Sequence, residues 1–296
     1  MAKNTTNERL QFETLPMTGH PTADRYGVMG HPISHSKSPI IHARFAEQTG
    51  QSITYIAIHV LLGGFARAIA DFLSEGGKGL SITIPFKEEA RELVDALTPR
   101  ARRANAVNTI LFDESGKTVG DNTDGIGLIR DLQENRKMPV SGRRVLLLGA
   151  GGAARGIIGP LLDANPHTLV IANRTPEKAE ELARRFARNG TVRGCGLADL
   201  ESVSFDLIIN ATSASLAGEI PTIPDTVLRP NGWCYDLMYD ISQPTAFVRW
   251  GEQRGASRAV DGLGMLVEQA AEAFYLWRGT RPRTAPVITA LRDSSQ

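Results

Sequence analysis

Short apolar runs that alternate with stretches of helical periodicity run through most of the chain. In the first 120 residues, strands are expected at 26–30, 53–60, 79–84, 106–112 and 118–120, and helices at 38–50, 64–74 and 86–97. After residue 140, strands are expected at 144–148, 168–172, 206–210, 233–237 and 257–260, and helices at 151–164 and 176–189. Such alternation is typical of an α/β fold built on largely parallel sheets.

A glycine-rich turn follows the strand at 144–148 and opens the next helix. Gly149, Gly151 and Ala154 form the pattern GxGxxA, and a second strand follows at 168–172. In this context the first glycine permits a tight turn, and the second lets the backbone approach a pyrophosphate. Amides at the helix N-terminus then face the phosphate groups. The pattern predicts a dinucleotide site that includes Gly149, Ala150, Gly151, Gly152 and Ala153.

The end of the second strand indicates which dinucleotide binds. An NAD site usually carries a carboxylate there, which accepts a hydrogen bond from the ribose 2′-hydroxyl. This chain has Asn173, Arg174 and Thr175 instead. An arginine fork and a hydroxyl suit a 2′-phosphate, which a carboxylate would repel. We therefore predict NADP(H) as the cofactor; the alternative is that Arg174 is only a solvated charge at a helix start.

The two series of strands predict two domains. A helical segment at 123–134 links them, and a long helix with an apolar face, 265–277, is expected to return to the first domain. The predicted division is a flexible tail at 1–23, a first domain formed by 24–123 and 262–296, and a Rossmann-like domain at 124–261. Pro160 lies inside a predicted helix, so we expect a kink there, with a break near Gly156.

Composition and charge exclude several classes of protein. The 296 residues are 42% hydrophobic with a formal net charge of +1, which gives no argument for a nucleic-acid or anionic membrane partner. No apolar run approaches the roughly 18 residues of a membrane helix, and the polar first 22 residues do not resemble a signal peptide. Only two cysteines occur, which fits a reducing, cytoplasmic compartment. A monomer and a homodimer are both compatible with the sequence.

The loop before the helix at 38–50 is a candidate anion site. Ser38 followed by Pro39 predicts a helix start, with the hydroxyl as cap and proline at the first helical position. Ser36 and Ser38 then lie at a helix N-terminus, where free amides favour an anion; alternatively, Ser38 serves only as the cap. His31 and His35 lie nearby without a carboxylate cluster, so no metal site is expected.

Four stretches together resemble the shikimate dehydrogenase family, the NADP-dependent enzymes of aromatic amino-acid biosynthesis. They are GHPISHSKSP at 30–39, ITIPFKEEA at 82–90, ANAVNT with GDNTDG at 104–125, and DGLGMLVEQAA at 261–271. The GAGGAA turn, the NRT strand end and NATS at 210–213 agree with this resemblance. It implies an N-terminal α/β substrate domain, a Rossmann-like NADP domain, C-terminal helices on the first domain, and reversible reduction of 3-dehydroshikimate to shikimate.

The resemblance also implies roles for individual residues. Reduction needs a proton donor for the nascent alkoxide, or at least a positive charge beside it. Lys87 is expected to be the general acid/base, or an electrostatic stabiliser, while Asp124 orients it and binds a substrate hydroxyl. Ser36 and Ser38 would bind the substrate carboxylate. Further substrate contacts are implied for Thr83, Asn108, Tyr239 and Gln269. Further cofactor contacts are implied for Lys178, Thr212, Gly262 and Met265.

Two positions depart from the family pattern, and two alternative functions compete. Many relatives have asparagine where Ser81 stands, and relatives often have arginine where Lys178 stands; an ammonium binds phosphate only as a point charge. An NAD-preferring quinate/shikimate dehydrogenase is one alternative, but that branch tends to carry an acid at the position of Asn173. A non-catalytic NADP(H)-binding sensor is the other, and the presence of both Lys87 and Asp124 counts against it.

Overall fold

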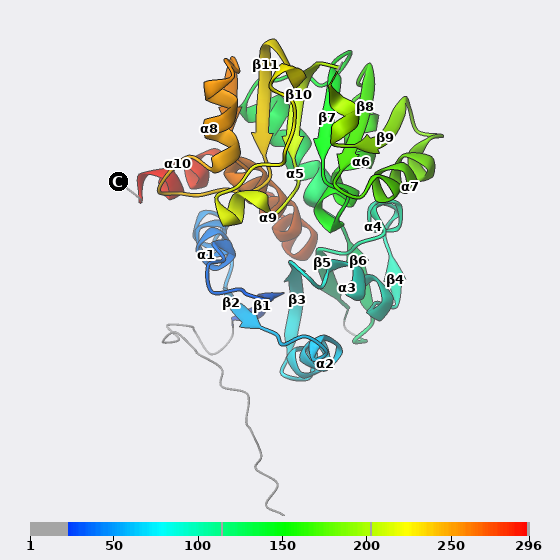
Figure 1. Cartoon of the computed structure of the whole chain (residues 1–296). Coiled ribbons are helices and arrows are strands. Elements are labelled where there is room, and N and C mark those ends of the chain that lie inside the picture. The colour runs from blue at the N-terminus through cyan, green and yellow to red at the C-terminus, as the bar shows by residue number, and fades with distance from the viewer. Residues whose placement is uncertain (1–22, 114, 202, 295–296) are drawn as a thin grey trace, which may run out of the picture.

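The computed structural model describes residues 23–113, 115–201 and 203–294, which form two six-stranded sheets (Figure 1). The first sheet has the order β2-β1-β3-β5-β6-β4 and mixes parallel and antiparallel pairs. Its strands are β1 Asp24–Gly30, β2 Ile53–His59, β3 Gly77–Ile82, β4 Ala96–Leu97, β5 Thr109–Phe112 and β6 Thr118–Asp121. Its helices are α1 Ser38–Thr49, α2 Phe65–Ser74, α3 Lys87–Leu93 and α4 Pro99–Ala104.

The second sheet is parallel throughout and has the order β12-β11-β10-β7-β8-β9. Its strands are β7 Arg144–Leu148, β8 Thr168–Asn173, β9 Val192–Gly196, β10 Phe205–Asn210, β11 Leu228–Asp236 and β12 Arg258–Val260. Its helices are α6 Gly152–Asp163, α7 Pro176–Phe186 and α8 Ala246–Gln253, with short turns η2 Ala198–Leu200, η3 Ala214–Ala217 and η4 Asp225–Val227. The α/β fold predicted from the sequence is confirmed.

Strand β7 is buried on both faces, which explains its continuous apolar run. Val145 and Leu147 enter one hydrophobic cluster, and Leu146 and Leu148 enter another on the opposite side of the sheet. Because side chains alternate along a strand, a strand covered on both faces needs apolar residues at every position.

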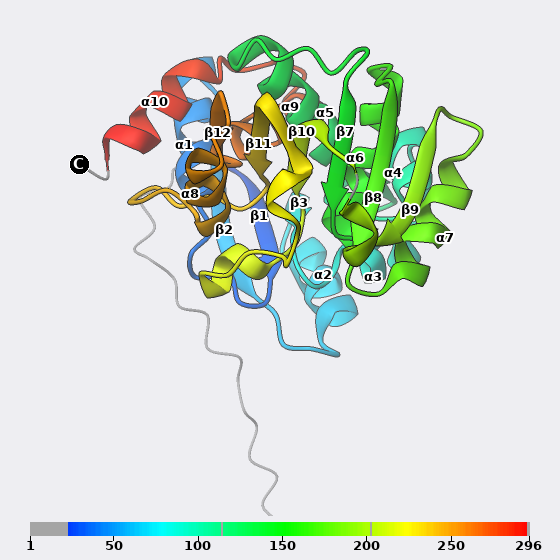
Figure 2. The same ribbon diagram turned by 45° about the horizontal axis from the view of Figure 1, so that its top comes forward.

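Two helices connect the sheets. Helix α5 Asp124–Arg130, continued by the π-turn η1 Asp131–Asn135, packs on α9 Leu263–Arg278. A Cβ at Gly127 would lie 2.8 Å from the Gln269 backbone nitrogen, so the two helices approach closely. The Trp277 indole donates to the Ile110 carbonyl (3.1 Å), which confirms that the last long helix returns to the first sheet. A further helix, α10 Ala285–Asp293, lies beside α1 (Figure 2).

The predicted helix at 86–97 is wrong in its last third, residues 94–97. Helix α3 ends at Leu93, Ala96 and Leu97 pair with β6, and α4 then begins at Pro99. The Thr98 hydroxyl accepts a hydrogen bond from the Ala101 amide (3.2 Å). A capping threonine followed by proline is a second helix start, so this segment holds two short helices in place of the one long helix that was predicted.

Two other local predictions need correction. Strand β9 was not expected, because its two glycines hide it; a Cβ at Gly194 would lie 2.4 Å from the Ala179 carbonyl on α7. Helix α6 is not broken near Gly156. The Pro160 ring faces Gly125 of α5, where a Cβ would approach it to 2.3 Å, so the proline is accommodated by a missing side chain.

At the start of α1, Ser38 is the first helical residue and not the cap. Lys37 occupies the cap position and its side chain makes no capping hydrogen bond. The predicted flexible tail at 1–23 lies outside the described residues except for its last position. Among the described helices, none has the length and apolar character needed to cross a bilayer.

Candidate active site

Lys87 and Asp124 meet although 37 positions separate them in the chain. Lys87 is the first residue of α3 and Asp124 the first residue of α5. The Lys87 Nζ atom lies 2.6 Å from Asp124 Oδ2, and the two side chains are only 13% and 2% exposed. An ammonium and a carboxylate are thus held together at a nearly buried position, where a charge pair interacts more strongly than in water.

An amide side chain binds the other carboxylate oxygen of Asp124, and a second amide side chain lies beside the first. The Asn108 Nδ2 group donates to Asp124 Oδ1 (2.8 Å) and lies 3.4 Å from the acceptor Gln269 Oε1. The Asn108 Oδ1 atom accepts from the Thr123 amide (2.8 Å), which fixes the orientation of the Asn108 side chain. Residues from three separate elements therefore present adjacent donors and acceptors, the pattern needed to bind hydroxyl groups.

The serine loop, residues 31–37 with Ser38 at the start of α1, carries a second group of polar residues. The Ser38 amide donates to Ser36 Oγ (3.3 Å). Tyr239 interacts with the Lys37 backbone, and burial raises the pKa of the Tyr239 hydroxyl. Thr83 follows β3 on the loop that leads to Lys87, and its methyl group occupies the space left by Gly30.

Sequence reasoning missed Tyr55 of β2. Burial raises the pKa of this tyrosine, and the neighbouring Ser81 and Ser38 hydroxyls oppose the rise. The Tyr55 hydroxyl is buried and, among the described residues, has no partner with good hydrogen-bond geometry. A tyrosine inside an apolar strand carries no sequence signal for a site, because only the sheet register places it beside the serine loop.

The glycine turn opens beside the same pair. Gly149 has φ +105°, and a Cβ there would lie 3.2 Å from the Ala211 carbonyl and from Thr212 Cγ2. No atom lies within 4 Å of a Cβ built on Gly151, so the turn is open on that side. A Cβ on Gly152 would lie 3.9 Å from Lys87 Cβ. The structure therefore brings Thr212 to the turn, and the turn to Lys87.

The end of β8 lies next to this turn, because β7 and β8 are parallel neighbours. The Asn173 side chain donates to the Thr175 carbonyl (2.9 Å) and shapes the loop. Arg174 and Thr175 are exposed on this loop, and Lys178 is exposed in the first turn of α7. Their charges and hydroxyl are thus available to a ligand rather than committed to the fold.

The last two predicted cofactor residues have clear packing roles. A Cβ at Gly262 would lie 2.3 Å from the Leu237 carbonyl, so the chain approaches too closely there for any side chain. Met265 is buried in the same hydrophobic cluster as Ala150 of the glycine turn. A cofactor contact for either residue therefore stays a prediction.

The histidines of the first loop are arranged differently from a metal site. His31 Nδ1 lies 2.8 Å from His59 Nε2, and the two rings are nearly parallel. Within the described part of the chain, no three histidine, cysteine or acidic side chains gather in a way that could hold a metal ion.

Comparison with known proteins supplies the family context for this geometry. The chain matches models of the shikimate dehydrogenase substrate binding domain over residues 28–110, of shikimate / quinate 5-dehydrogenase over 131–246, and of the shikimate 5′-dehydrogenase C-terminal domain over 262–292. It is 57% identical to a shikimate dehydrogenase (NADP(+)) of Nitrosococcus oceani, covering 91% of this chain and 95% of the relative.

Two further matches agree. The chain is 58% identical to a shikimate dehydrogenase (NADP(+)) of Alkalilimnicola ehrlichii, covering 91% of this chain and 98% of the relative. The crystal structure of shikimate 5-dehydrogenase from Thermus thermophilus in complex with NADP(H) and shikimate superposes with a TM-score of 0.80 at 32% identity, covering 92% of this chain and 99% of that one.

Proposed function

The chain belongs to the shikimate dehydrogenase family, and we propose that it interconverts shikimate and 3-dehydroshikimate with NADP(H), using Lys87 and Asp124 as its catalytic pair. The observation that carries the residue assignment is the 2.6 Å contact between these two side chains, at a position that the glycine turn also borders. The NAD-preferring and non-catalytic alternatives are not favoured by the relatives, which are named as NADP(+) enzymes.

The residues of the second sheet fit NADP(H). The open side of Gly151 leaves room for a pyrophosphate at the N-terminus of α6, where backbone amides point outward. Arg174, Thr175 and Lys178 would hold the 2′-phosphate, with a guanidinium fork, a hydroxyl and an ammonium. When bound, the cofactor supplies or accepts the hydride.

Lys87 is the proton donor in the direction of reduction. As the ring carbonyl becomes an alkoxide, the Lys87 Nζ proton passes to that oxygen, and the reverse direction returns it. The Asp124 carboxylate holds the ammonium in place from one side, so that no reorganisation is needed when negative charge develops. Asp124 itself is held by Asn108 at its other oxygen.

The remaining polar residues orient the substrate. Asn108 and Gln269 offer a donor and an acceptor at the rim of the pair, which suits two ring hydroxyls. Ser36 and Ser38 would take the substrate carboxylate. Contacts at several points of the ring fix the reacting carbon relative to Lys87. The entropy cost of bringing the reacting groups together is then met by substrate binding and not in the chemical step.

The test begins with the purified full chain, shikimate and either NADP⁺ or NAD⁺, followed by nicotinamide absorbance. We expect turnover with NADP⁺. Lys87→Met should lower kcat by about 10²–10⁴-fold, the usual contribution of a general acid/base. Lys78→Met is the matched control, because Lys78 is an exposed lysine at the start of β3 in the first sheet. Near-normal turnover of a folded Lys87→Met enzyme would refute the role of Lys87.

The domain division and the location are also proposals. We propose that residues 24–123 with 262–296 form the substrate domain and residues 124–261 the NADP domain, which the two sheets support. A cytoplasmic location is supported by the two cysteines, Cys195 and Cys234, which are buried and unpaired. The near-neutral charge supports a small molecule as the partner.

A further inference from the structure

Asp121 is a buried carboxylate at the end of β6, three residues before Asp124, and it is only 1% exposed. Its Oδ1 atom accepts hydrogen bonds from Thr98 Oγ1 (2.6 Å) and from the Asn122 amide (2.7 Å). Arg100 binds both carboxylate oxygens, through Nε to Oδ1 (3.1 Å) and Nη2 to Oδ2 (2.6 Å). A two-point guanidinium contact fixes the orientation of the carboxylate as well as its distance.

The loop from Asp121 to Asp124 is held by consecutive side-chain contacts. The Asn122 Nδ2 group donates to the Ala106 carbonyl (3.1 Å), and Asn122 Oδ1 accepts from the Asp124 amide (3.1 Å). The Asp121 carboxylate therefore holds the Asn122 backbone, and the Asn122 side chain holds the Asp124 backbone. A rotation of Asp121 would be transmitted to the residue that contacts Lys87.

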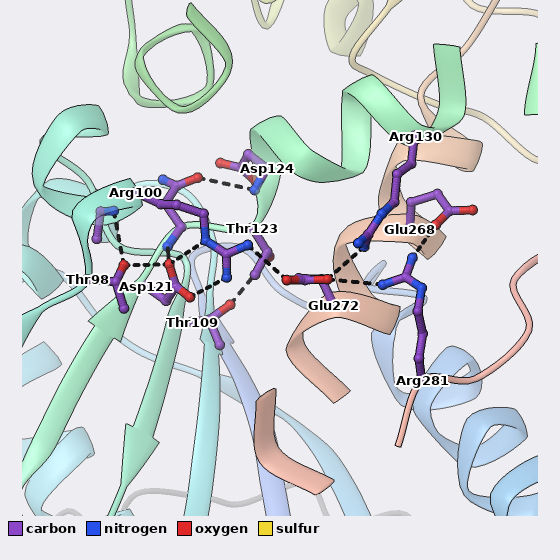
Figure 3. A network of polar contacts seen from close by, with 12 residues as sticks. Thr98, Arg100, Thr109, Asp121, Thr123, Asp124, Arg130, Glu268, Glu272 and Arg281 are labelled. Carbon is purple, nitrogen blue, oxygen red and sulfur yellow. Dashed lines mark hydrogen bonds and ion pairs between the residues drawn. The ribbon is translucent and has the colours of Figure 1, made fainter. Parts of the chain in front are cut away.

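Arg100 also reaches the opposite side of the site. Its Nη1 group donates to Glu272 Oε1 on α9 (2.8 Å). Glu272 lies three residues after Gln269, so the two side chains project from neighbouring turns of one helix face. Figure 3 shows Arg100 between Asp121 and Glu272, with two more arginines beyond Glu272.

Those arginines anchor Glu272 firmly. Its Oε2 atom accepts from Arg130 Nη1 (2.6 Å) and Arg281 Nη1 (3.0 Å). Burial raises the pKa of Glu272, but hydrogen bonds from Arg100 and Arg130 outweigh it and the pKa is lowered overall. Glu272 is therefore a charged, fixed point on α9, and Arg100 is the link from it to the Asp121 loop.

We propose that Arg100 is a positioning residue for the reaction: it holds the Asp121–Asp124 loop and α9 at a set separation, so that Asp124 and Gln269 face the same substrate ring. This inference rests on the proposed function. Arg100 acts through Asp121 and Glu272 and does not itself serve as an acid, base or substrate ligand. Without the Arg100 guanidinium, the buried carboxylates of Asp121 and Glu272 would lose the cation that joins them. The Asp121–Asp124 loop could then shift relative to α9.

The first test compares Arg100→Gln and Arg100→Lys with the unsubstituted enzyme, at a temperature where all are folded. A displacement of about 1 Å at a reacting group costs up to about 10²-fold in rate, so Arg100→Gln should lose about 10–10²-fold in kcat with an unchanged KM for NADP⁺. Arg100→Lys should recover part of this loss, since it restores the charge but not the fork. A lower Tm with an unchanged kcat would overturn the proposal.

The matched control is Arg254→Gln. Its side chain is 34% exposed, as is that of Arg100, but it pairs with Asp225, which is 69% exposed. Breaking this surface pair should leave kcat unchanged. A loss of kcat in this variant equal to that of Arg100→Gln would mean that any broken ion pair disturbs the enzyme, and would also overturn the proposal.

Amide hydrogen exchange in the substrate-free protein separates this proposal from the proposed function. Loss of the Arg100 contacts should let the loop at 121–124 open more often, so the Asn122 and Asp124 amides should exchange at least about tenfold faster in Arg100→Gln. Unchanged exchange there would refute positioning whatever the activity. If the unsubstituted protein does not turn over shikimate, the proposed function fails, and the exchange rates alone decide whether Arg100 sets the loop.

Discussion

The buried histidine His42 makes the stability of the fold depend on pH. It lies on α1 with 0% exposure, and its ring stacks on Tyr55 at a centroid distance of 4.0 Å. Among the described residues, neither ring nitrogen has a hydrogen-bond partner. Burial therefore lowers the pKa of His42 from 6.5 to about 3, because the charged imidazolium would lose its hydration without compensation.

The lowered pKa makes folding stability depend on pH. Below pH 6.5 the unfolded chain binds a proton at His42 that the folded chain does not bind, so acid favours unfolding. The contribution of the neutral His42 to the free energy of unfolding is fully present above pH 6.5 and is lost as the pH falls toward about 3. At most one proton is involved, so the free energy of unfolding changes with pH by at most about 1.4 kcal/mol per pH unit. Between pH 7 and 4.5 the free energy of unfolding therefore falls by about 2.5 kcal/mol.

Urea unfolding at a series of pH values measures this loss. His42→Leu removes the titrating group, so the free energy of unfolding of the unsubstituted protein should fall by about 2.5 kcal/mol more than that of the variant between pH 7 and 4.5. Comparing the change with pH, rather than the absolute stability, removes the packing cost of the substitution. His167→Leu is the control, because it removes an exposed histidine instead of a buried one.

Parallel curves for the His42→Leu variant and the unsubstituted protein would refute this reasoning. They would mean that His42 is hydrated or paired in the folded protein, and that α1 does not bury an uncompensated imidazole.

Two further predictions test the cofactor site and the contact between α5 and α6. Arg174→Gln should raise the KM for NADP⁺ by about 10–100-fold, because the variant loses a hydrogen bond to a charged phosphate. The KM for NAD⁺, which has no 2′-phosphate, should stay unchanged. Equal effects on both cofactors in steady-state assays would contradict a 2′-phosphate contact. Gly125→Ala should lower the free energy of unfolding by about 1–3 kcal/mol, because the new Cβ would lie 2.3 Å from Pro160 Cγ and 2.6 Å from the Gly156 carbonyl. An unchanged free energy of unfolding in urea would show that α5 and α6 can move apart at no cost.

The sequence alone predicted the elements whose pattern is local. Strand β7, the glycine turn and the α6 start follow one another within a few residues, so periodicity and turn chemistry suffice to find them. The break between α3 and α4 is also local in principle, since Thr98 and Pro99 form a helix start. Strand β9 is different, because its glycines weaken the strand signal and only pairing with β8 identifies it.

The candidate site was predicted through family motifs and not through spacing. No spacing in the chain relates Lys87 to Asp124, and only the family resemblance implied that the two side chains lie together; in the structure they are 2.6 Å apart. Tyr55 and Arg100 were not predicted at all. Tyr55 looks like a core strand residue, and Arg100 looks like a solvated charge on a short basic helix.

Residue type and local periodicity therefore determined the fold class, the cofactor turn and which side chains have the chemistry for catalysis. The tertiary structure decided which of those side chains meet, because contacts such as Arg100 with Glu272 join residues 172 positions apart. Such contacts depend on how the two sheets and α9 pack together. That packing joins residues far apart in the chain, so the short-range pattern of residues cannot predict it.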